Sequence, residues 1–406
     1  MRLVTKIFTG GVLFIGLLIA GFVFLLKGCL SKYDERYALP TVLYFEQPDK
    51  AIMFSIVKYD ETTSYQQHNG FISKSFDNHC FIQSNNATTG EKIQSKELKR
   101  PDKKNYNEEA LGASGSNAWV FIDELMAFNA FTLEKVADVK IIEQKNPQLK
   151  GMLPKENRYY HFNDADKSIS ITVKDGSRWK LNTTTLLATP EEEKEDKDMD
   201  MEERERLSVL KNLQRSNVSY TDMFVNQDTV APQWFGLYSR EEIQKLDGWI
   251  RIGTAYTGEA RRQFFTTAYT HIRDNHFELD KTTLKNSSSD YFLDGGFLLN
   301  RQTAEPVKGN NDDGYFIIYK SQVGNEGEIL LCLVNNAGKV LWRLNSGLNS
   351  WTDWHFSGNR LLILGADNKN LGSSKCNVLI SVDTGTGQAS SYDFFTDKTR
   401  QAIKEK

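Results

Sequence analysis

The chain has 406 residues, of which 39% are hydrophobic and 25% are charged, and its formal net charge is −3. This composition is typical of a folded chain long enough for one large domain or two ordinary ones. The near balance of charge excludes the strong basic excess by which nucleic-acid-binding proteins are recognised. Aromatic residues make up 12% of the chain, which favours β-strands over helices.

The N-terminal segment Ile7–Leu26 contains no charged residue. Twenty residues at about 1.5 Å rise span the roughly 30 Å hydrocarbon core of a bilayer, whereas a cleaved secretory signal has a shorter apolar region of about 7–15 residues. We therefore expect residues 1–30 to form a single-pass membrane anchor with a transmembrane helix. Basic residues flank the segment on both sides, but a short head before a signal-like helix usually stays cytoplasmic. The body is therefore expected outside the cytoplasm, on the periplasmic side of an inner membrane.

A second interpretation uses Cys29. The run Leu26-Lys27-Gly28-Cys29 resembles the bacterial lipoprotein signal, in which the chain is cut before a cysteine that receives lipid. Lys27 departs from that pattern, and the length of the apolar segment favours the anchor helix. Both interpretations place the body at a membrane surface.

The remaining cysteines, Cys80, Cys332 and Cys376, are scattered and form no C-x-x-C pair, so the sequence indicates neither a zinc site nor a dense disulfide framework. One disulfide among the three is the alternative in an oxidising compartment. Unpaired cysteines in the core are favoured.

A strand–turn–strand pattern recurs along the body. In each copy an apolar run ends in Asn or Asp, and Thr or Gly follows before the next extended stretch. The six anchor residues are Asn85, Asn129, Asn182, Asn300, Asn335 and Asp383. Asn and Asp end a strand in this way because their side chains accept a backbone N–H two residues on, and Gly supplies a positive φ.

The anchors are separated by 44, 53, 118, 35 and 48 residues, and apart from the long gap these values match the roughly 40–50 residues of a four-stranded propeller blade. The last copy predicts strands over 351–357, 360–365, 377–382 and 388–394, each with one buried face. The prediction is an all-β fold, a β-propeller of about 6–8 four-stranded blades over residues 31–398, followed by a tail at 399–406. A β-sandwich, which would need turns every 8–12 residues, is the alternative. Whether the segment Thr41–Phe45 closes the ring against the last blade is left open.

The hydrophobic–Asp–x–x–Thr–Gly turn resembles the repeat of quinoprotein-type β-propellers, the family that includes pyrroloquinoline-quinone alcohol dehydrogenases and the lipoprotein propellers of outer-membrane assembly. The unit Asp383–Gly387 matches this pattern, and the unit beginning at Asn85 keeps the Thr-Gly pair with one extra residue. The resemblance implies the architecture over most of residues 40–395 and carries over no catalytic residue.

The long gap contains a predicted acidic helix at about 190–215. Thr189-Pro190-Glu191-Glu192 reads as a capping box with Pro at the first helical position, and ten of the fifteen residues 191–205 are acidic. A second capping box, Ser239 to Glu242, predicts a short helix over 241–246.

Two clusters invite a metal hypothesis. Asp196, Asp198 and Asp200 alternate as in a calcium loop, but Met201 and Leu207 replace the required Gly and Glu, which favours a solvated helix. His271 and His276 flank Asp274, but a single strand would turn the two imidazoles to opposite faces. His161 and His355 are expected to be packed aromatics in strands. We expect no metal site and no cofactor site.

The sequence contains no G-x-S-x-G, phosphate-binding or dinucleotide motif, and no catalytic residues are assigned. We expect a non-catalytic binding or scaffolding module of the cell envelope that contacts the membrane and a protein partner, with the acidic helix as the natural contact, and not nucleic acid. The alternatives are a quinone-dependent dehydrogenase and an accessory lipoprotein of envelope assembly. The dehydrogenase is disfavoured because the chain is short for an eight-bladed enzyme and has no adjacent cysteine pair.

Overall fold

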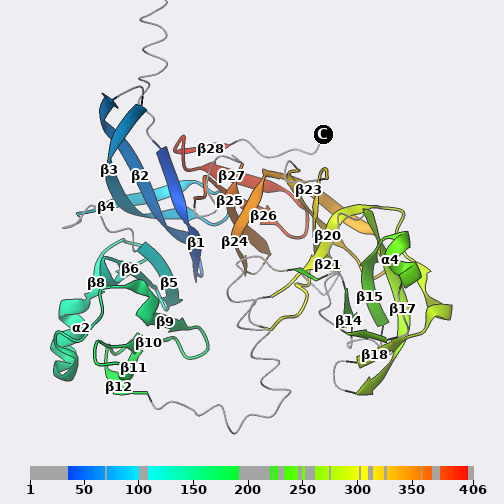
Figure 1. The fold of residues 1–406 in the computed structure, drawn as a ribbon, viewed down its shortest axis with the longest axis horizontal. Helices are drawn as coiled ribbons and strands as arrows, with labels where there is room; N and C mark the ends of the chain where they lie inside the picture. Colours follow the sequence, from blue (N-terminus) through cyan, green and yellow to red (C-terminus); the bar gives the residue numbers. More distant parts are fainter. Residues whose placement is uncertain are drawn as a thin grey trace, which may run out of the picture.

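The fold was analysed in a computed structural model that describes residues 35–400 except 69–70, 100–107, 192–219, 222, 227–232, 246–248, 252–260, 274–275, 301–302, 310–313, 324–326, 358 and 368–374. It is all-β and is built from antiparallel sheets of four or more strands (Figure 1). Each of the sheets below comes from one continuous stretch of chain. The all-β prediction is confirmed, together with the recurrence of four-stranded sheets.

The first three sheets follow one another in sequence. Sheet 1 contains β1 (Glu35–Gln47), β2 (Lys50–His68), β3 (Phe71–Asn86) and β4 (Lys92–Leu98). Sheet 2 contains β5 (Glu108–Ser114), β6 (Asn117–Ile122), β7 (Glu124–Asn129) and β8 (Lys135–Asp138). After helix α2 (Val139–Lys145) and the 3₁₀ turns Pro147–Leu149 and Asn157–Tyr159, sheet 3 contains β9 (Tyr160–Asn163), β10 (Ser168–Thr172), β11 (Arg178–Asn182) and β12 (Ala188–Pro190).

The long gap between the turns at 182 and 300 contains a fourth sheet. It consists of β14 (Met223–Asn226), β15 (Gln233–Tyr238), β17 (Arg261–Arg273) and the short β19 (Lys285–Asn286), with helix α4 (Arg240–Lys245), the 3₁₀ turn Lys281–Thr283 and the side hairpin of β16 (Trp249–Arg251) and β18 (His276–Leu279). Two register pairs, Arg261 with Leu293 and Arg262 with Phe292, join β17 to β20 (Phe292–Leu298), so this unit and the next form one hydrogen-bonded path of strands. Strand β20 also pairs with β13 (Tyr220–Thr221).

Sheet 5 contains β20 (Phe292–Leu298), β21 (Tyr315–Lys320), β22 (Ile329–Val334) and β23 (Val340–Leu348). Sheet 6 contains β24 (Ser350–Ser357), β25 (Arg360–Ala366), β26 (Val378–Asp383), β27 (Ala389–Asp393) and the edge strand β28 (Lys398–Arg400). The four strands expected for the last unit are confirmed. Because β28 reaches Arg400, the sheet extends past the boundary expected at 398.

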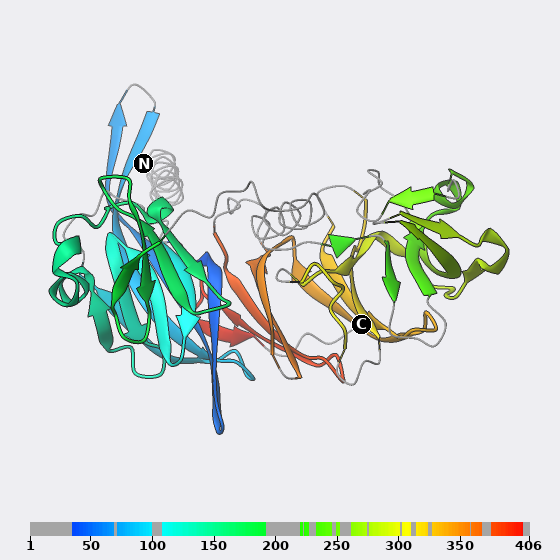
Figure 2. The ribbon, with the colours of Figure 1, turned by 90° about the horizontal axis from the view of Figure 1, so that it is seen from below.

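The sheets stand face to face in a curved row, as Figures 1 and 2 show together. An apolar cluster fills each of five junctions. These lie between sheets 3 and 2, sheets 2 and 1, sheets 1 and 6, sheets 6 and 5, and sheets 5 and 4. The N-terminal and C-terminal sheets are therefore direct neighbours in the row.

The inner sheets are buried on both faces. In β25, Leu361 and Ile363 pack toward sheet 5, whereas Leu362 and Leu364 pack toward sheet 1. In β26 even Ser381 is fully buried, and its hydroxyl donates a hydrogen bond to the carbonyl of Ala87 in sheet 1. The prediction of one buried face per strand is wrong here, because a sheet with a neighbour on each side has no solvent face.

The predicted turns share one hydrogen-bond pattern. The side-chain oxygen of Asp383 accepts the N–H groups of Gly385 and Thr386 at 3.1 and 2.9 Å, and the Thr386 hydroxyl accepts the N–H of Gln388 at 3.3 Å. The same turn begins at Asn86, Asn129, Asn182 and Asn300. A turn one residue shorter begins at Asn335.

The anchor expected at Asn85 is one residue off. Asn86 accepts the turn N–H groups, whereas Asn85 is buried and donates to the carbonyl of Gly90. In every copy of the longer turn the fifth residue has a positive φ. These residues are Gly90, Leu133, Leu186, Ala304 and Gly387. Three of them are not glycine, so the hydrogen bonds of the turn hold a backbone conformation that L-residues disfavour by about 1–2 kcal/mol.

The junction of sheets 1 and 6 joins residues more than 290 positions apart. Ala38 and Cys376 form an isolated antiparallel bridge, and the N–H of Val42 donates to the buried Asp353 carboxylate at 3.0 Å. Strand β1, which contains 41–45, therefore packs beside β24 without joining its sheet. This answers the question left open by the sequence.

Two charged contacts flank the apolar centre of this junction. At one, Asp397 of sheet 6 accepts from Arg36, Lys92 and Tyr392, with 2.9 Å to Arg36. At the other, Lys375 pairs with Glu35 and Asp60 of sheet 1 and lies over the Tyr37 ring at 4.3 Å. Burial raises the pKa of Asp60, and the cations Lys375 and Lys58 oppose that rise.

The helices differ from the expectations in part. The Ser239–Glu242 capping box is confirmed, with Ser239 N–H donating to Glu242 at 2.7 Å and Glu242 N–H donating to the Ser239 hydroxyl at 3.1 Å. Helix α2, capped by Asp138, was not predicted. The capping box at Thr189 is wrong, because Thr189 and Pro190 lie in β12, where they pair with β11.

The rest of the predicted acidic helix, at 192–215, and the expected anchor at residues 1–30 lie outside the described residues. Among the residues that are described, no helix is both long and apolar enough to cross a membrane.

Replacing the turn residue Asp383 by Ala is expected to lower the free energy of unfolding by about 1 kcal/mol, because the two N–H groups lose a charged acceptor. Asp383→Asn keeps the acceptor and is expected to stay within about 0.5 kcal/mol of the parent. Urea unfolding of the three chains measures this. Equal losses for Ala and Asn would mean that the charge, rather than the turn geometry, stabilises the hairpin.

The Asp397 contact predicts an acid-sensitive junction. Burial alone would raise the pKa of Asp397, but hydrogen bonds from Lys92 and Tyr392 and the charge of Arg36 lower it below its usual value. A carboxylate with a lowered folded-state pKa stabilises the fold above its unfolded-state pKa, near 3.9, and this contribution is lost as the pH falls through the folded-state value.

Asp397→Asn is therefore expected to cost about 1 kcal/mol at pH 7 and progressively less below about pH 4. The control is Asp164→Asn, an exposed pair with Lys167 at 3.0 Å. It is expected to change stability by less than about 0.5 kcal/mol. Thermal unfolding between pH 3 and 7 measures both. A cost for Asp397→Asn that does not depend on pH would contradict the assignment.

Candidate functional site

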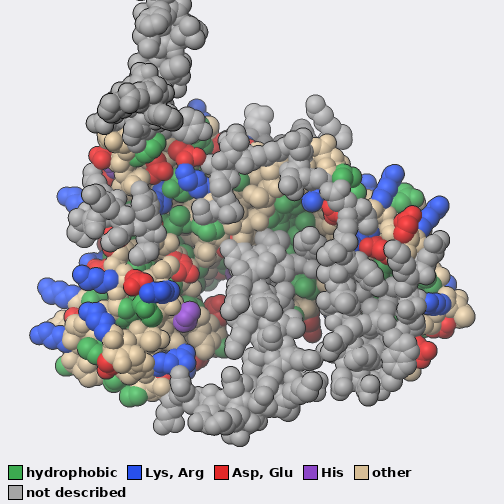
Figure 3. All heavy atoms as spheres, viewed as in Figure 1, with side chains coloured by type: hydrophobic (Ala, Val, Ile, Leu, Met, Phe, Trp, Pro, Cys, Tyr) green, Lys and Arg blue, Asp and Glu red, His purple; other side chains and the backbone are tan. Residues whose placement is uncertain are grey.

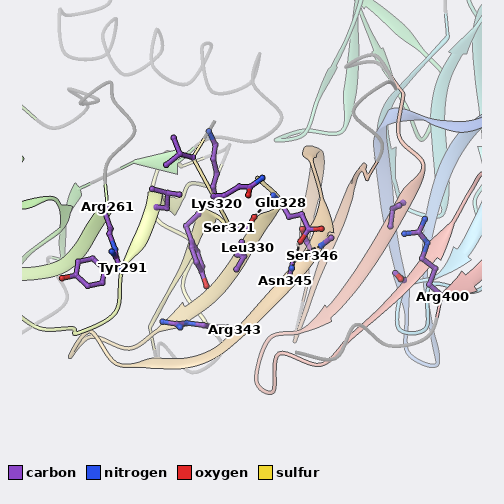
Figure 4. Close-up of a pocket in the computed structure, with 17 residues that line it drawn as sticks. Arg261, Tyr291, Lys320, Ser321, Glu328, Leu330, Arg343, Asn345, Ser346 and Arg400 are labelled. Atoms are coloured by element: carbon purple, nitrogen blue, oxygen red, sulfur yellow. Dashed lines mark hydrogen bonds between the residues drawn. The ribbon is translucent and has the colours of Figure 1, made fainter. Parts of the chain in front are cut away.

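A cleft of about 1040 Å³ crosses sheet 5 and reaches sheet 6. Arg261 and Tyr291 lie at one end and Arg400 at the other, with Lys320, Glu328, Arg343 and Asn345 between them (Figure 4). Strands β17, β21, β23 and β28 supply its arginines and its lysine, and Glu328 directly precedes β22, so the lining comes from sheets 4, 5 and 6.

The basic lining residues are held by carboxylates. Arg343 pairs with Asp290 at 2.6 Å, and Lys320 pairs with Asp294 at 3.2 Å. Burial alone would lower the pKa of Arg343, but Tyr319 and Asp290 raise it, so this guanidinium is a permanent cation. A guanidinium has five N–H donors in a rigid fork, and one ion pair leaves donors for a ligand.

Arg400 forms the same kind of contact at the far end. Its guanidinium pairs with both Asp367 and Asp393 at 2.6 Å. Asp367 directly follows β25 and Asp393 ends β27, the two strands on either side of β26, so the contact also ties β28 to the sheet. Acidic and basic side chains are likewise interspersed over the described surface in Figure 3. The cleft is therefore polar and charge-paired rather than a strongly single-signed field.

Exposed aromatic and apolar groups accompany these charges. The guanidinium of Arg261 lies 4.1 Å from the centre of the Tyr291 ring, a cation–π contact. Tyr291 is 40% exposed and Val323 is 56% exposed. Arg and Tyr are the residue types most enriched at the energetic centres of protein interfaces, so this end of the cleft resembles a recognition surface.

Two hydroxyl groups of the lining are engaged by the backbone. Ser321 accepts the N–H of Glu328 at 2.9 Å, and Ser346 donates to the carbonyl of Ile329 and accepts the N–H of Leu348. The described lining residues include no His or Cys.

The histidines of interest are placed differently from the expectations. His271 and His276 do not share a strand: they lie on β17 and β18, the two arms of a hairpin. His355 is packed as expected, stacked on Tyr44 with 4.8 Å between ring centres. His161 lies in β9 as expected but is exposed, so the prediction that it packs is wrong.

The cysteines Cys80, Cys332 and Cys376 are unpaired and buried, which confirms the favoured reading. Burial raises the pKa of Cys376 to about 12, so its thiol is neutral and unreactive. No group of three or more potential ligands gathers for a metal ion among the described residues. The Asp196–Asp200 cluster lies outside them.

Comparison with known proteins identifies no family for this chain. No protein-family model matches the sequence, and the curated proteins contain no significant match. One solved structure that is matched comes from a S. cerevisiae complex of a Dbp5 variant bound to Nup159, a Gle1 variant, IP6 and ADP. The identity is 8%, the match covers 82% of this chain and 93% of that chain, and the TM-score is 0.19. A score this low carries no argument about fold or function.

Proposed function

We propose that the protein is a membrane-tethered, non-catalytic β-propeller that binds or scaffolds a protein partner in the cell envelope. The observation that supports this is the face-to-face row of six antiparallel units, in which sheets 1 and 6, from the two ends of the chain, are direct neighbours. A propeller is a rigid scaffold that places recognition on loops and strand ends, and the cleft of sheets 5 and 6 is such a place.

The finer architecture rests on the repeat. Six antiparallel units of four or more strands, joined at five junctions by apolar clusters, are the lower end of the expected 6–8 blades. The turn pattern at five hairpins supports a resemblance to quinoprotein-type propellers in architecture. The cleft gives no support for the quinone chemistry of that family.

The tether rests on the sequence. The uncharged segment Ile7–Leu26 is long enough to cross a bilayer, and Cys29 follows it. The proposed location of the body is the extracytoplasmic face, and lipidation of Cys29 is the second route to the same membrane surface.

Two variants of the full chain separate these routes. Leu17→Arg/Leu18→Arg puts two charges at the centre of the apolar segment, at about 2.5–3.5 kcal/mol each, and is expected to release the protein from alkali-washed membranes. Cys29→Ser is expected to leave it there. Release by Cys29→Ser would establish the lipoprotein route. Retention of the double-arginine chain after the alkaline wash would contradict the transmembrane anchor.

The binding surface is tested by photo-crosslinking in native membranes. A photoreactive residue at Tyr291 or Val323 is expected to give the same adduct, because both side chains lie at the cleft. Leu187, 53% exposed on sheet 3, is the matched control. Since a charge-assisted contact is worth about 1.5–3 kcal/mol, adding Arg343→Gln should lower the adduct yield at least about tenfold.

Adducts of equal yield from Leu187 would assign the partner to another surface. No adduct from either cleft position would contradict the proposed site.

A further inference from the structure

The two central strands of sheet 1 extend beyond its edge strands. Strand β1 begins where Glu35 pairs with Asp60 of β2, and β4 ends where Leu98 pairs with Cys80 of β3. Past these points β2 and β3 pair only with each other in the described part of the chain, from Glu61 opposite Asp77 to His68 opposite Phe71. Figure 2 shows this ribbon, residues 61–68 and 71–79, projecting beyond the rest of the molecule.

The direction of the ribbon is set by the register. Strand β2 is antiparallel to β1, so residues 61–68 continue past Glu35 on the side from which the chain enters β1. The N-terminal segment therefore leads to the root of the ribbon. Eight residues at about 3.3 Å each place the free end roughly 26 Å beyond Asp60.

The connection to the membrane is short. Eight residues, 27–34, separate Leu26, the end of the uncharged segment, from Glu35, so nine Cα–Cα steps join the two. Fully extended they reach about 31 Å, and as a flexible chain their mean span is about 17 Å. The span is thus shorter than the ribbon unless the linker is almost straight. Lipidation at Cys29 would leave only five residues, 30–34, and shorten it further.

We propose that the ribbon lies against the lipid interface and forms a second contact between the body and the membrane. This rests on the proposed tether. The composition fits a zwitterionic interface, because residues 61–79 include Tyr65, Phe71 and Phe76, and Phe76 is 45% exposed. Aromatic residues favour the headgroup region. The same residues contain one lysine, one aspartate and one glutamate, so attraction to anionic lipid is not the driving force.

The test uses the full chain in phosphatidylcholine nanodiscs. Single cysteines carrying an environment-sensitive fluorophore are placed at Gln67 near the free end, Ser75 midway and Asp49 in the β1–β2 turn, which points the opposite way in Figure 2. The unsubstituted chain gives the background from native thiols, and far-UV circular dichroism checks that each labelled chain is folded.

With nitroxide-labelled lipid, emission from Gln67 is expected to shift to the blue and lose most of its intensity. Emission from the label at Ser75 should lose less intensity. Emission from the label at Asp49 should be the same with and without nitroxide-labelled lipid. Adding phosphatidylglycerol should leave this order unchanged. Equal signals from Gln67 and Asp49 in chains that co-elute with the nanodiscs would overturn the ribbon contact while leaving the tether intact. Failure to co-elute would instead overturn the tether, and the contact with it.

Discussion

Burial of both faces of every inner sheet is the constraint on which the rest of this structure depends. In β22, Leu331 and Leu333 pack toward sheet 6, whereas Cys332 and Val334 pack toward sheet 4. A sheet with two apolar faces cannot be stable alone, because each face removed from its neighbour exposes apolar surface at about 25 cal/mol per Å². The sheets must therefore stack as a row, and the row must curve because β-sheets twist with one hand.

The turns could be predicted from the sequence because their chemistry is local. A side-chain acceptor, a hydroxyl three residues on and a residue with positive φ lie within six positions, so Asp383–Gly387 is visible as a pattern. The spacing also identifies the correct asparagine at the first turn. Only Asn86 has Thr three residues and Gly four residues further on, as Asp383 does, whereas the unit counted from Asn85 contains one extra residue. The structure agrees, since Asn86 accepts the turn N–H groups and Asn85 is buried.

The failed predictions share a dependence on distant contacts. Thr189 and Pro190 carry a strong helix-start signal, but pairing with β11 outweighs it, as tertiary context commonly does with local propensity. Both faces of β26 are buried because sheets 1 and 5 cover them, and those partners come from distant parts of the chain. The cleft residues could not be predicted from the sequence, because no local pattern distinguishes them. Three strands that are far apart in the chain bring together Arg261, Arg343 and Arg400.

The junction of sheets 1 and 6 is the one described junction whose two sides come from opposite ends of the chain. The other four join sheets that are consecutive in sequence, so their loop-closure entropy is smaller. Contacts between chain ends are slow to form, and apolar burial alone would not fix the position of one sheet against the other. The polar contacts around the apolar cluster fix that position. Asp397 pairs with Arg36 and Lys92, and Asp353 accepts the N–H of Val42. These contacts have directions, whereas apolar surfaces can slide. The packing of β1 against β24 also determines where Glu35 lies, and hence where the chain enters the body. The packing that joins the two halves of the row therefore fixes the root of the ribbon, and the proposed contact with the bilayer depends on that position.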